Sequence, residues 1–393
     1  MTELIYLDNS ATTKVSPKAI KAALWAMEEC YGNPSSAHAE GARAAHALAD
    51  ARAKLLRFFK DEPGELCFNS GGSEGNTTAI CGIASAYAKR GRCILVSSIE
   101  HPSVLEPAKV LKEKGFDVQF IPVDKKGLVD LAALEQLLTE DVILTSVQHV
   151  NNETGAIQPL AKIGEICKAK APESFFHVDG VQSFAKLPLD PGSWRMDMFT
   201  ASGHKIHAPK GVGLIWFRKN LRLPPLILGG GQEKNLRSGT ENIPGILAFA
   251  AAAEEVAASW DADIANIINM RERLLGLLNE GAPDFVVNSP LDENGAPHVL
   301  NISFPGVKSE VLLHYLEDKG VCVSAGSACH SSKKSSSHVL EAMGLAPEVI
   351  NSAIRFSFSS YNTIAEVETA AQITIDAVNQ IRDLFGYEQK KRR

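Results

Sequence analysis

Long hydrophobic runs are absent from this sequence. No window of the 393 residues approaches the ~20 uninterrupted apolar residues that a membrane-spanning helix needs. The N-terminus, MTELIYLDNSATT, lacks the basic region and following apolar run of a secretory signal. We therefore expect a soluble, cytoplasmic protein with no membrane partner.

A strong charge of either sign is also missing. The chain has 40 basic and 46 acidic residues and a pI near 6.0. A protein that binds nucleic acid over a broad surface usually carries a clear basic excess. We therefore expect no direct nucleic-acid partner, and a small molecule as substrate.

Paired cysteine motifs are the third absence. The seven cysteines are odd in number and include no CxxC, which argues against a disulfide framework or a structural zinc site, so we expect no metal. Six of them have apolar neighbours, as in ELCFN and GVCVS, where a cysteine is usually a small buried hydrophobe. Cys329 is the exception and needs a separate explanation.

Cys329 lies in the stretch SAGSACHSSKKSSSHVL, in which seven of the fourteen residues from Ser324 to Ser337 are serine. So few apolar side chains predict a mobile loop. His330, Lys333 and Lys334 are cations that would lower the pKa of the thiol and raise its thiolate fraction. Cys329 is therefore a candidate nucleophile.

Short β-rich runs alternate with helical patterns over the first half of the chain, as in ELCFN, RCILVSS, DVILTSVQHV, SFFHVDG, MDMFTAS and VGLIWF. This alternation predicts an α/β fold with a mainly parallel sheet covered by helices on both faces. A Pro/Gly-rich connection after Trp216 leads to a helical stretch from Glu241 to Trp260. We expect a large domain over residues 15–258, and a smaller α+β domain formed by residues 1–14 and 259–393.

The smaller domain is expected to begin with a separate helix over 262–280. Further predicted elements are strands near 284–288, 298–304, 320–324 and 354–358, and helices over 309–319 and 363–386. The basic tail EQKKRR is expected to be solvated.

Asp179 and Lys205 follow successive predicted strands. In open α/β sheets ligands bind at the carboxyl ends of strands, although Asp179 taken alone would more often be a helix N-cap. Lys205, 26 residues later in TASGHKIHAPKG, would be buried and needs a carboxylate or a covalent partner. Pyridoxal phosphate would satisfy both residues, with a Schiff base to the lysine and the aspartate on its pyridinium nitrogen.

A phosphate cradle is present in NSGGSEGN. Gly72 allows close backbone approach and Ser73 offers a hydroxyl where a helix is predicted to begin, and helix N-termini favour phosphate. Gly-Ser turns are common, so this signal is weak alone. Combined with Asp179 and Lys205 in this order, it predicts a pyridoxal phosphate site.

Other polar residues are expected at the same edge of the sheet. His101 could lie over a flat ring, or be a capping histidine; Gln182 could reach a ring hydroxyl; Asn152 could bind ring or substrate. Arg355 could hold a substrate carboxylate by two hydrogen bonds, or form a structural salt bridge. His204 and His207 also suggest a metal pair, which the intervening Lys205 disfavours.

Taken together, these motifs resemble the cysteine desulfurases of the NifS/IscS type, in the class V aminotransferase group of fold-type I pyridoxal phosphate enzymes. The similarity runs nearly end to end, through YLDNSATT, GNPSSAH, NSGGSEGN, EHPSV, HVNNETG, HVDGVQS, SGHKIHAPKG, GGGQEKNLRSGT, SAGSAC, SHVLEAMG and RFSFS. Ser73 replaces the threonine usual in the phosphate loop but keeps the hydroxyl. The serine-rich sequel of SAGSAC resembles the branch with an extended catalytic loop.

The resemblance implies a role for each matching residue. Lys205 would hold the cofactor covalently, Asp179 would pair with its pyridinium, and His101 would stack on the ring and assist proton transfer. Gln182 would bind the ring oxygen, Asn152 would support cofactor and substrate, and Arg355 would bind the substrate carboxylate. The residues expected to bind the phosphate are Gly72, Ser73, Ser202 and His204, together with Thr240 of the other subunit of a homodimer.

The implied reaction converts L-cysteine to L-alanine and leaves a persulfide on Cys329. The sulfur would pass to an acceptor, such as an iron–sulfur scaffold or a tRNA thiolase. A selenocysteine lyase would use the same groups and stays an alternative, as does a class V aminotransferase, which needs no loop thiol. A non-enzymatic sulfur carrier is disfavoured by the presence of both Asp179 and Lys205.

Overall fold

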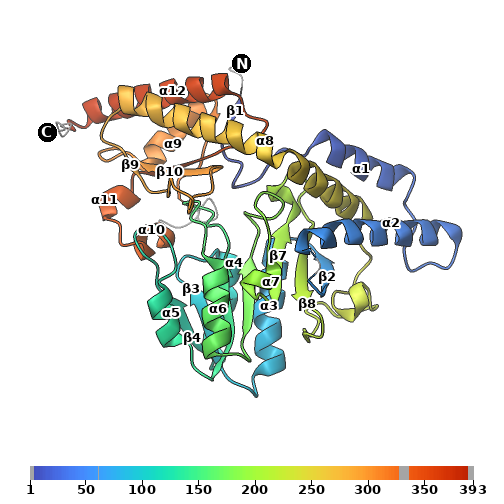
Figure 1. Ribbon diagram of the computed structural model, residues 1–393. Coiled ribbons are helices and arrows are strands. Elements are labelled where there is room, and N and C mark those ends of the chain that lie inside the picture. The colour runs from blue at the N-terminus through green and yellow to red at the C-terminus, as the bar shows by residue number, and fades with distance from the viewer. Residues whose placement is uncertain (1–3, 61, 327–335, 388–393) are drawn as a thin grey trace.

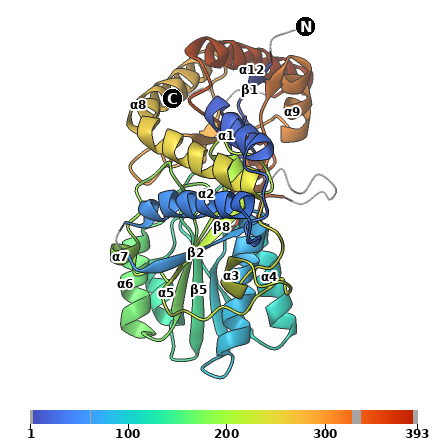
Figure 2. The same cartoon turned by 90° about the vertical axis from the view of Figure 1, so that its right-hand side faces the viewer.

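The computed structural model describes residues 4–60, 62–326 and 336–387. Its largest sheet has seven strands (Figures 1 and 2). In spatial order they are β2 (Gly64–Asn69), β8 (Gly213–Arg218), β7 (Met198–Ser202), β6 (Phe175–Asp179), β5 (Val142–Gln148), β3 (Cys93–Ser97) and β4 (Asp117–Ile121). Six of these strands run in the same direction and β8 alone runs opposite to them, so the sequence-based expectation of a mainly parallel sheet is confirmed.

Helices cover both faces of this sheet. They are α1 (Pro17–Glu28), α2 (Ala39–Leu56), α3 (Gly72–Tyr87), α4 (Pro102–Glu113), α5 (Leu131–Leu137), α6 (Leu160–Lys170), α7 (Pro191–Trp194) and the start of α8 (Ile243–Gly281), with short 3₁₀ turns η1 (Arg57–Phe59), η2 (Gly203–Lys205) and η3 (Glu233–Asn235). Successive side chains of β3 point to opposite faces, as the strand geometry requires. Ile94 and Val96 join one hydrophobic cluster with α3 and α4, and Leu95 joins the cluster on the other face.

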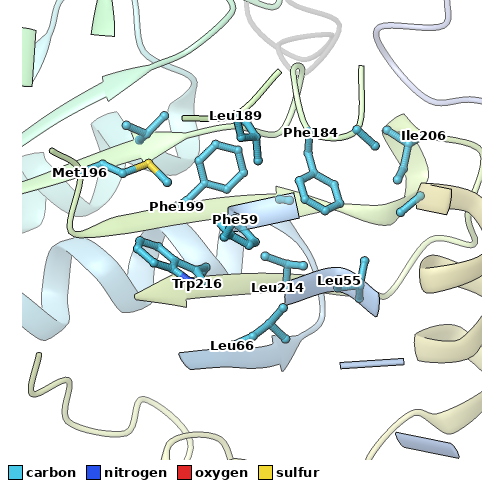
Figure 3. Close-up of a cluster of buried hydrophobic side chains, with 14 of the residues drawn as sticks. Leu55, Phe59, Leu66, Phe184, Leu189, Met196, Phe199, Ile206, Leu214 and Trp216 are labelled. Atoms are coloured by element: carbon cyan, nitrogen blue, oxygen red, sulfur yellow. The ribbon is translucent and has the colours of Figure 1, made fainter. Parts of the chain in front are cut away.

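Aromatic side chains fill the core between the sheet and α2 (Figure 3). The rings of Phe59 and Trp216 are stacked, with centroids 5.0 Å apart and an interplanar angle of 6°. Phe199 meets Phe59 edge-on at 5.5 Å, and Phe184 packs beside both. All four side chains are fully buried. Because a closely packed core resists movement, this cluster fixes the positions of β7 and β8, and with them the residues that follow β7.

A second group of elements lies above the large sheet in Figure 1. It contains the parallel pair β1 (Ile5–Tyr6) and β11 (Val321–Cys322), and an antiparallel sheet in the order β12 (Ala353–Ser357), β10 (Val299–Ser303) and β9 (Val286–Val287). Its helices are α9 (Ser309–Asp318), α10 (His338–Ala342), α11 (Pro347–Ile350) and α12 (Ile364–Leu384). A separate hydrophobic cluster joins these strands to α9, α12 and the end of α8.

The expectation of two helices, over 241–260 and 262–280, is wrong. One continuous helix, α8, runs from Ile243 to Gly281. No proline or glycine occurs between Gly245 and Gly276, so no residue in that stretch breaks the helix. The expected domain boundary after residue 258 falls inside α8, and the division into 15–258 and the rest stays a prediction.

The two halves of α8 pack in different places. Its first half contacts α1 and α2, and its second half contacts α12. Within the described part of the chain, α8 is the one helix long and apolar enough to cross a membrane, judged by length and composition alone. Its packing against three other helices is that of a core helix.

Candidate active site

The polar residues expected at the carboxyl ends of the strands line one cavity of about 340 Å³. Parallel strands end at the same edge of a sheet, so residues that follow β3, β5, β6 and β7 come together there. The lining includes Gly72, Ser73, His101, Asn152, Asp179, Gln182, Ser202, His204, Lys205 and Arg355, together with Ser10, Ala11, Ser103, Gln148, Val150 and Val181. Lys205 and Asp179 thus open onto the same space.

Lys205 lies in η2, directly after β7. Its Nζ donates hydrogen bonds to the backbone oxygens of Ser10, at 2.5 Å, and Ala11, at 2.8 Å. The N-terminal segment, 194 residues away in sequence, therefore forms one wall of the cavity. Local sequence patterns gave no sign of this contribution.

Asp179 ends β6 and precedes a turn, so it is not a helix N-cap. Its Oδ2 accepts a hydrogen bond from Asn76 Nδ2, at 2.8 Å, and its Oδ1 accepts one from the Val181 amide, at 2.9 Å. Burial raises the pKa of the carboxyl group, and these hydrogen bonds and the charge of Lys205 oppose the rise. A cation facing Asp179 would stabilise its ionised form.

Asn76 was not singled out from the sequence. It lies on α3 one turn after Gly72, in the same NSGGSEGN motif, and its Nδ2 also reaches Ser103 Oγ at 2.9 Å. The helix position was the available signal, because residues four apart share one face of a helix. Asn76 links the start of α3 to the Asp179 carboxylate.

The N-terminus of α3 has the features of an anion cradle. The helix begins at Gly72 after Gly71, whose φ of 146° favours glycine. A Cβ on Gly72 would approach Val181 Cγ2 to 2.7 Å, so only glycine fits without a shift. Because the first amides of a helix have no partner within it, they can bind an anion beside Ser73 and the buried Ser202.

His204 also lines the cavity, and its imidazole is in the neutral form. Burial and the nearby charge of Lys205 lower the pKa of its imidazole to about 4. His204 Nδ1 lies 3.2 Å from Thr12 Oγ1, while His207 Nδ1 lies 2.8 Å from the backbone oxygen of Lys14. In the described part of the chain, no three His, Cys, Asp or Glu side chains converge to hold a metal ion.

His101 is a capping histidine that also lines the cavity, and its position over a ring stays a prediction. It is the N-cap of α4, where its Nδ1 accepts a hydrogen bond from the Ser103 amide at 3.1 Å, and its side chain also lines the cavity. Gln182 donates from Nε2 to the backbone oxygen of Ser10, at 3.0 Å. Its buried Oε1 has no hydrogen-bond partner among the described residues, which leaves an acceptor available at this wall.

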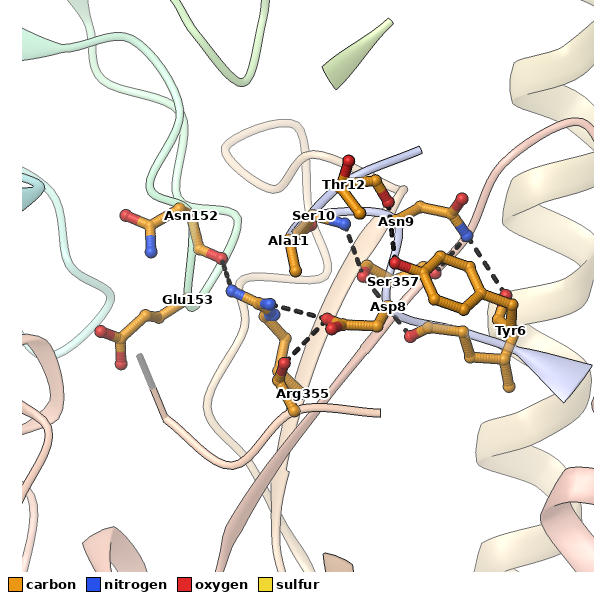
Figure 4. A network of polar contacts seen from close by, with 12 residues as sticks. Tyr6, Asp8, Asn9, Ser10, Ala11, Thr12, Asn152, Glu153, Arg355 and Ser357 are labelled. Carbon is orange, nitrogen blue, oxygen red and sulfur yellow. Dashed lines mark hydrogen bonds and ion pairs between the residues drawn. The ribbon is translucent and has the colours of Figure 1, made fainter. Parts of the chain in front are cut away.

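Arg355 enters the cavity from β12 in the second group of elements (Figure 4). Its Nη2 lies 2.8 Å from Asp8 Oδ1, and its Nη1 donates to the backbone oxygen of Asn152 at 2.8 Å. The buried Nε has no hydrogen-bond partner within the described residues. The sequence analysis considered a structural salt bridge for Arg355 without identifying its partner, which is Asp8. This salt bridge orients the guanidinium and leaves donor capacity for a ligand.

Cys329 lies outside the described residues, as does the tail EQKKRR. The chain on either side of 327–335 is held next to the cavity. Ser324 Oγ donates to Asp8 Oδ1 at 2.8 Å on one side, and Ser337 Oγ donates to Glu153 Oε2 at 2.5 Å on the other. Asp8 binds Arg355 and Glu153 follows Asn152, so both flanks are attached to the cavity wall.

Thr240 does not line this cavity. It is exposed on the segment between η3 and α8. The expectation that it acts in the other subunit of a homodimer concerns a second chain, and it stays a prediction.

The cavity fits pyridoxal phosphate on four observations. A helix N-terminus with glycine and hydroxyl groups faces it from α3, and a buried carboxylate, Asp179, faces it from β6. Lys205 supplies a primary amine, and Gln182 has an unpartnered buried acceptor. An anion cradle, an acid and an amine around one cavity match the phosphate, ring nitrogen and aldehyde of this cofactor.

Glu100, which precedes His101, was not considered in the sequence. Its carboxyl group is fully buried, and burial raises its pKa to about 8. One oxygen accepts from Ser97 Oγ, at 2.7 Å, and from the Gln148 amide, at 2.6 Å, while Oε2 has no partner among the described residues. Glu100 is therefore protonated in the folded protein over a pH range in which it is ionised in the unfolded chain.

We expect this burial to make stability depend on pH. Between the ordinary value of 4.5 and about 8, the folded state binds more protons at Glu100 than the unfolded state does. The contribution of Glu100 to the free energy of unfolding therefore falls as pH rises through this window, by about 1.4 kcal/mol per unit of pKa difference. Glu100→Gln should flatten the pH dependence measured by urea unfolding at pH 5, 6, 7 and 8.

The control for Glu100 is Glu106→Gln, which changes an exposed glutamate on the adjoining helix α4. This variant should keep the pH dependence of the wild type. Equal slopes in the wild type and in Glu100→Gln would contradict the assignment of a protonated carboxyl group.

The sequence and the fold match one family over nearly the whole chain. Residues 5–369 match the family model "Aminotransferase class-V". Cysteine desulfurase IscS 1 from Archaeoglobus fulgidus is 39% identical over 379 residues, which cover 96% of this chain and 98% of that protein. Cysteine desulfurase IscS from Methanosarcina thermophila is 38% identical and covers 99% of this chain and 95% of that protein.

Solved structures give the same result. A NifS-like protein superposes with a TM-score of 0.90 at 36% identity, covering 96% of this chain and all of that one. The NifS-like protein from Rickettsia africae has a TM-score of 0.85 at 31% identity, and covers 97% of this chain and all of that one.

Proposed function

Since this chain belongs to the class-V aminotransferase family and, within it, to the cysteine desulfurases, we propose that it converts L-cysteine to L-alanine with pyridoxal phosphate and forms a persulfide on Cys329. The observation that carries the proposal is that Lys205, Asp179, the start of α3 and Arg355 all line one cavity. The amine, acid, anion site and carboxylate-binding guanidinium that the reaction needs are therefore close together.

Different residues of the cavity would bind different parts of the cofactor. The start of α3, with Gly72 and Ser73, would bind the phosphate together with Ser202 and His204. Asp179 would bind the ring nitrogen and Gln182 the ring oxygen, and His101 would lie over the ring and assist proton transfer. When bound, pyridoxal phosphate supplies an electron sink next to the substrate Cα.

Arg355 and Asn152 place the substrate. The guanidinium is held by Asp8 and by the Asn152 backbone oxygen, so it is oriented before a ligand arrives. A preorganised arginine loses little conformational entropy on binding a carboxylate. With its carboxylate on Arg355, L-cysteine would turn its amino group towards Lys205, which lines the same cavity.

Lys205 acts as the base in this reaction, and Cys329 acts as the nucleophile. Lys205 holds the cofactor through its amine, and once released it accepts the proton from the substrate Cα. The Cys329 thiolate attacks the substrate sulfur; a sulfur–sulfur bond forms and the Cβ–S bond breaks. The electron pair of the broken bond stays with the organic fragment, which takes up a proton and leaves as alanine.

We further propose a cytoplasmic homodimer that passes the persulfide sulfur to an acceptor protein, for iron–sulfur assembly or for thiolation of tRNA or a cofactor. The exposed position of Thr240, away from its own chain's cavity, is compatible with a role in the partner's site. Transfer of labelled sulfur from cysteine to an iron–sulfur scaffold and to a tRNA thiolase would distinguish the acceptors.

The function is tested with purified protein and L-cysteine. We expect equal amounts of alanine and transferred sulfur, and one added sulfur atom on the peptide containing Cys329 by mass spectrometry. Amino transfer to a keto acid without release of sulfur would instead assign an aminotransferase. Strong preference for L-selenocysteine over L-cysteine, measured in parallel, would assign a selenocysteine lyase.

A further inference from the structure

The first turn of α3 carries a carboxylate as well as the anion cradle. Glu74 is the third residue of this helix, which begins at Gly72. Its Oε2 accepts a hydrogen bond from the Ser70 amide, at 2.9 Å, so the side chain reaches back over the start of the helix. The free amides and the dipole of a helix N-terminus attract any anion. Glu74 and a bound phosphate group therefore place like charges at the same end of α3.

Glu74 is ionised and largely shielded from solvent. Its side chain is 10% exposed. Burial opposes ionisation, but hydrogen bonds from Arg237 and Ser70 outweigh this effect and lower the pKa of the carboxyl group. Salt and solvent screen a partly buried charge less than an exposed one. Without a compensating cation, this carboxylate would repel a phosphate group in the cradle.

Arg237 supplies the compensating charge. Its Nε lies 3.0 Å from Glu74 Oε1, although the two residues are 163 positions apart in sequence. In the described part of the chain this is the only ion pair that Glu74 forms. The carboxylate at the start of α3 is therefore neutralised only while Arg237 stays in place.

The segment that precedes Arg237 has a strained backbone. Glu233, Lys234 and Asn235, which form η3, have φ angles of 47°, 57° and 68°. Non-glycine residues rarely adopt this left-handed region, and three in succession persist only where other contacts hold them. Because η3 ends two residues before Arg237, the contacts that hold η3 also set the position of Arg237.

Arg52 and strand β2 supply these contacts. The Arg52 guanidinium donates to both carboxylate oxygens of Glu233, at 2.6 and 2.9 Å, and also to the backbone oxygen of Leu66. Glu233 Oε2 accepts a further hydrogen bond from the Phe68 amide, at 2.9 Å. A paired guanidinium and carboxylate of this kind is strong and fixed in geometry, and the Glu233 side chain is only 3% exposed. The pair therefore attaches η3 to β2, the strand that leads into the cradle.

We propose that Arg237 is a positioning residue for phosphate binding, because it neutralises the Glu74 carboxylate at the start of α3. The Arg52–Glu233 pair holds Arg237 in the position that this role requires. Glu74 fixes the Ser70 amide and so shapes the cradle, while Arg237 removes the repulsion between that carboxylate and the phosphate. This role rests on the proposed function for the identity of the cofactor. Neither Glu74 nor Arg237 lines the cavity that contains Lys205, so both act through the cradle.

The test compares the binding of pyridoxal phosphate and of pyridoxal, which lacks the phosphate, to the full chain freed of cofactor. Both dissociation constants are measured by absorbance titration at the same salt concentration. Their ratio, pyridoxal over pyridoxal phosphate, reports what the phosphate contributes to binding. Arg237→Met should lower this ratio by about tenfold or more, because the phosphate then faces an unpaired carboxylate. Arg237→Lys keeps the charge and should retain more of the wild-type ratio.

A second substitution separates the charge of Arg237 from a structural role. When Glu74→Gln is added to Arg237→Met, the side-chain oxygen can still accept from the Ser70 amide but carries no negative charge. The ratio should then return close to that of the wild type, whereas a purely structural role for Arg237 predicts no recovery. An unchanged ratio in Arg237→Met, or no recovery in the double variant, would overturn the proposal.

Lys234→Met is the matched control on the same segment. Lys234 is an exposed cation three residues before Arg237, and its Nζ lies 2.8 Å from Glu65 Oε2. Because solvent screens an exposed ion pair, this variant should keep the wild-type ratio. A loss as large as that of Arg237→Met would show that the effect does not depend on Glu74, and would contradict the proposal.

The contribution of the Arg52–Glu233 pair is measured in the same way. Arg52→Met should lower the ratio in the direction of Arg237→Met, because η3 then loses the contacts that hold it. A wild-type ratio in Arg52→Met would refute the positioning role of this pair.

The result can be separated from foldability and from the function. If Arg237→Met fails to fold, Glu74→Gln alone decides: it leaves Arg237 as an uncompensated cation, so the ratio should rise above that of the wild type. An unchanged or lower ratio would then count against the proposal. If the protein bound pyridoxal phosphate but released no sulfur from L-cysteine, the proposed function would fall, while the ratios would still decide the role of Arg237.

Discussion

Lys205→Ala is expected to lower the rate of alanine formation from L-cysteine by about a thousandfold or more. The substitution removes the amine that holds the cofactor and the base that accepts the Cα proton, and general-base catalysis alone contributes 10²–10⁴-fold. It also leaves the backbone oxygens of Ser10 and Ala11 without this donor. The measurement is alanine release under saturating cofactor, with stability checked by urea unfolding.

The matched control for this substitution is Lys210→Ala, which removes an exposed lysine from the same segment. It should retain activity within a few-fold of the wild type. A Lys205→Ala protein that remained folded and kept a tenth of the wild-type rate would show that another group supplies the base.

Cys329→Ser is expected to lower sulfur release by about a hundredfold or more while leaving cofactor binding intact. A serine hydroxyl is far less ionised than a thiol at neutral pH, so it cannot attack the substrate sulfur effectively. Because Lys205, Asp179 and Arg355 are unchanged, the variant should still bind cofactor and L-cysteine. Binding of cofactor and substrate is measured by absorbance, and sulfur release is measured as sulfide in a thiol-containing buffer.

Cys322→Ala provides the comparison for Cys329→Ser. Cys322 lies seven residues earlier in β11, and burial raises the pKa of its thiol, so it is a poor nucleophile. This variant should form persulfide at the wild-type level. Wild-type alanine and sulfide production by Cys329→Ser would show that the nucleophile has been wrongly assigned.

Much of the large sheet could be predicted because each strand has a local signature. The runs ELCFN, RCILVSS and SFFHVDG correspond to β2, β3 and β6, and the β-rich and apolar composition of short runs is sufficient to predict such strands. Asp179 and Lys205 could be placed together for the same reason. They end neighbouring strands of a parallel sheet, and their chemistry is complementary.

The continuity of α8 was not predicted from the sequence. Two helical stretches were expected around Trp260, yet helix formation continues through it because the stretch contains no residue that breaks a helix. The hydrophobic face of α8 changes partners along its length, from α1 and α2 to α12. Packing against separate partners does not require a break in the helix itself.

The contacts that Asp8, Ser10 and Ala11 make at the cavity were also not predicted from the sequence. Asp8 pairs with Arg355 across 347 residues, and Ser10 and Ala11 accept from Lys205 across about half the chain. No periodicity or spacing reports hydrogen bonds over such separations.

From residue types and local patterns alone, the sequence determined most of the succession of strands and helices, and which side chains could carry the chemistry. Only the tertiary structure decided that the N-terminal segment forms a wall of the cavity and that Arg355 is oriented by Asp8. The physical reason is that local patterns report short-range backbone preferences, whereas burial and long-range hydrogen bonds exist only once distant segments have packed together.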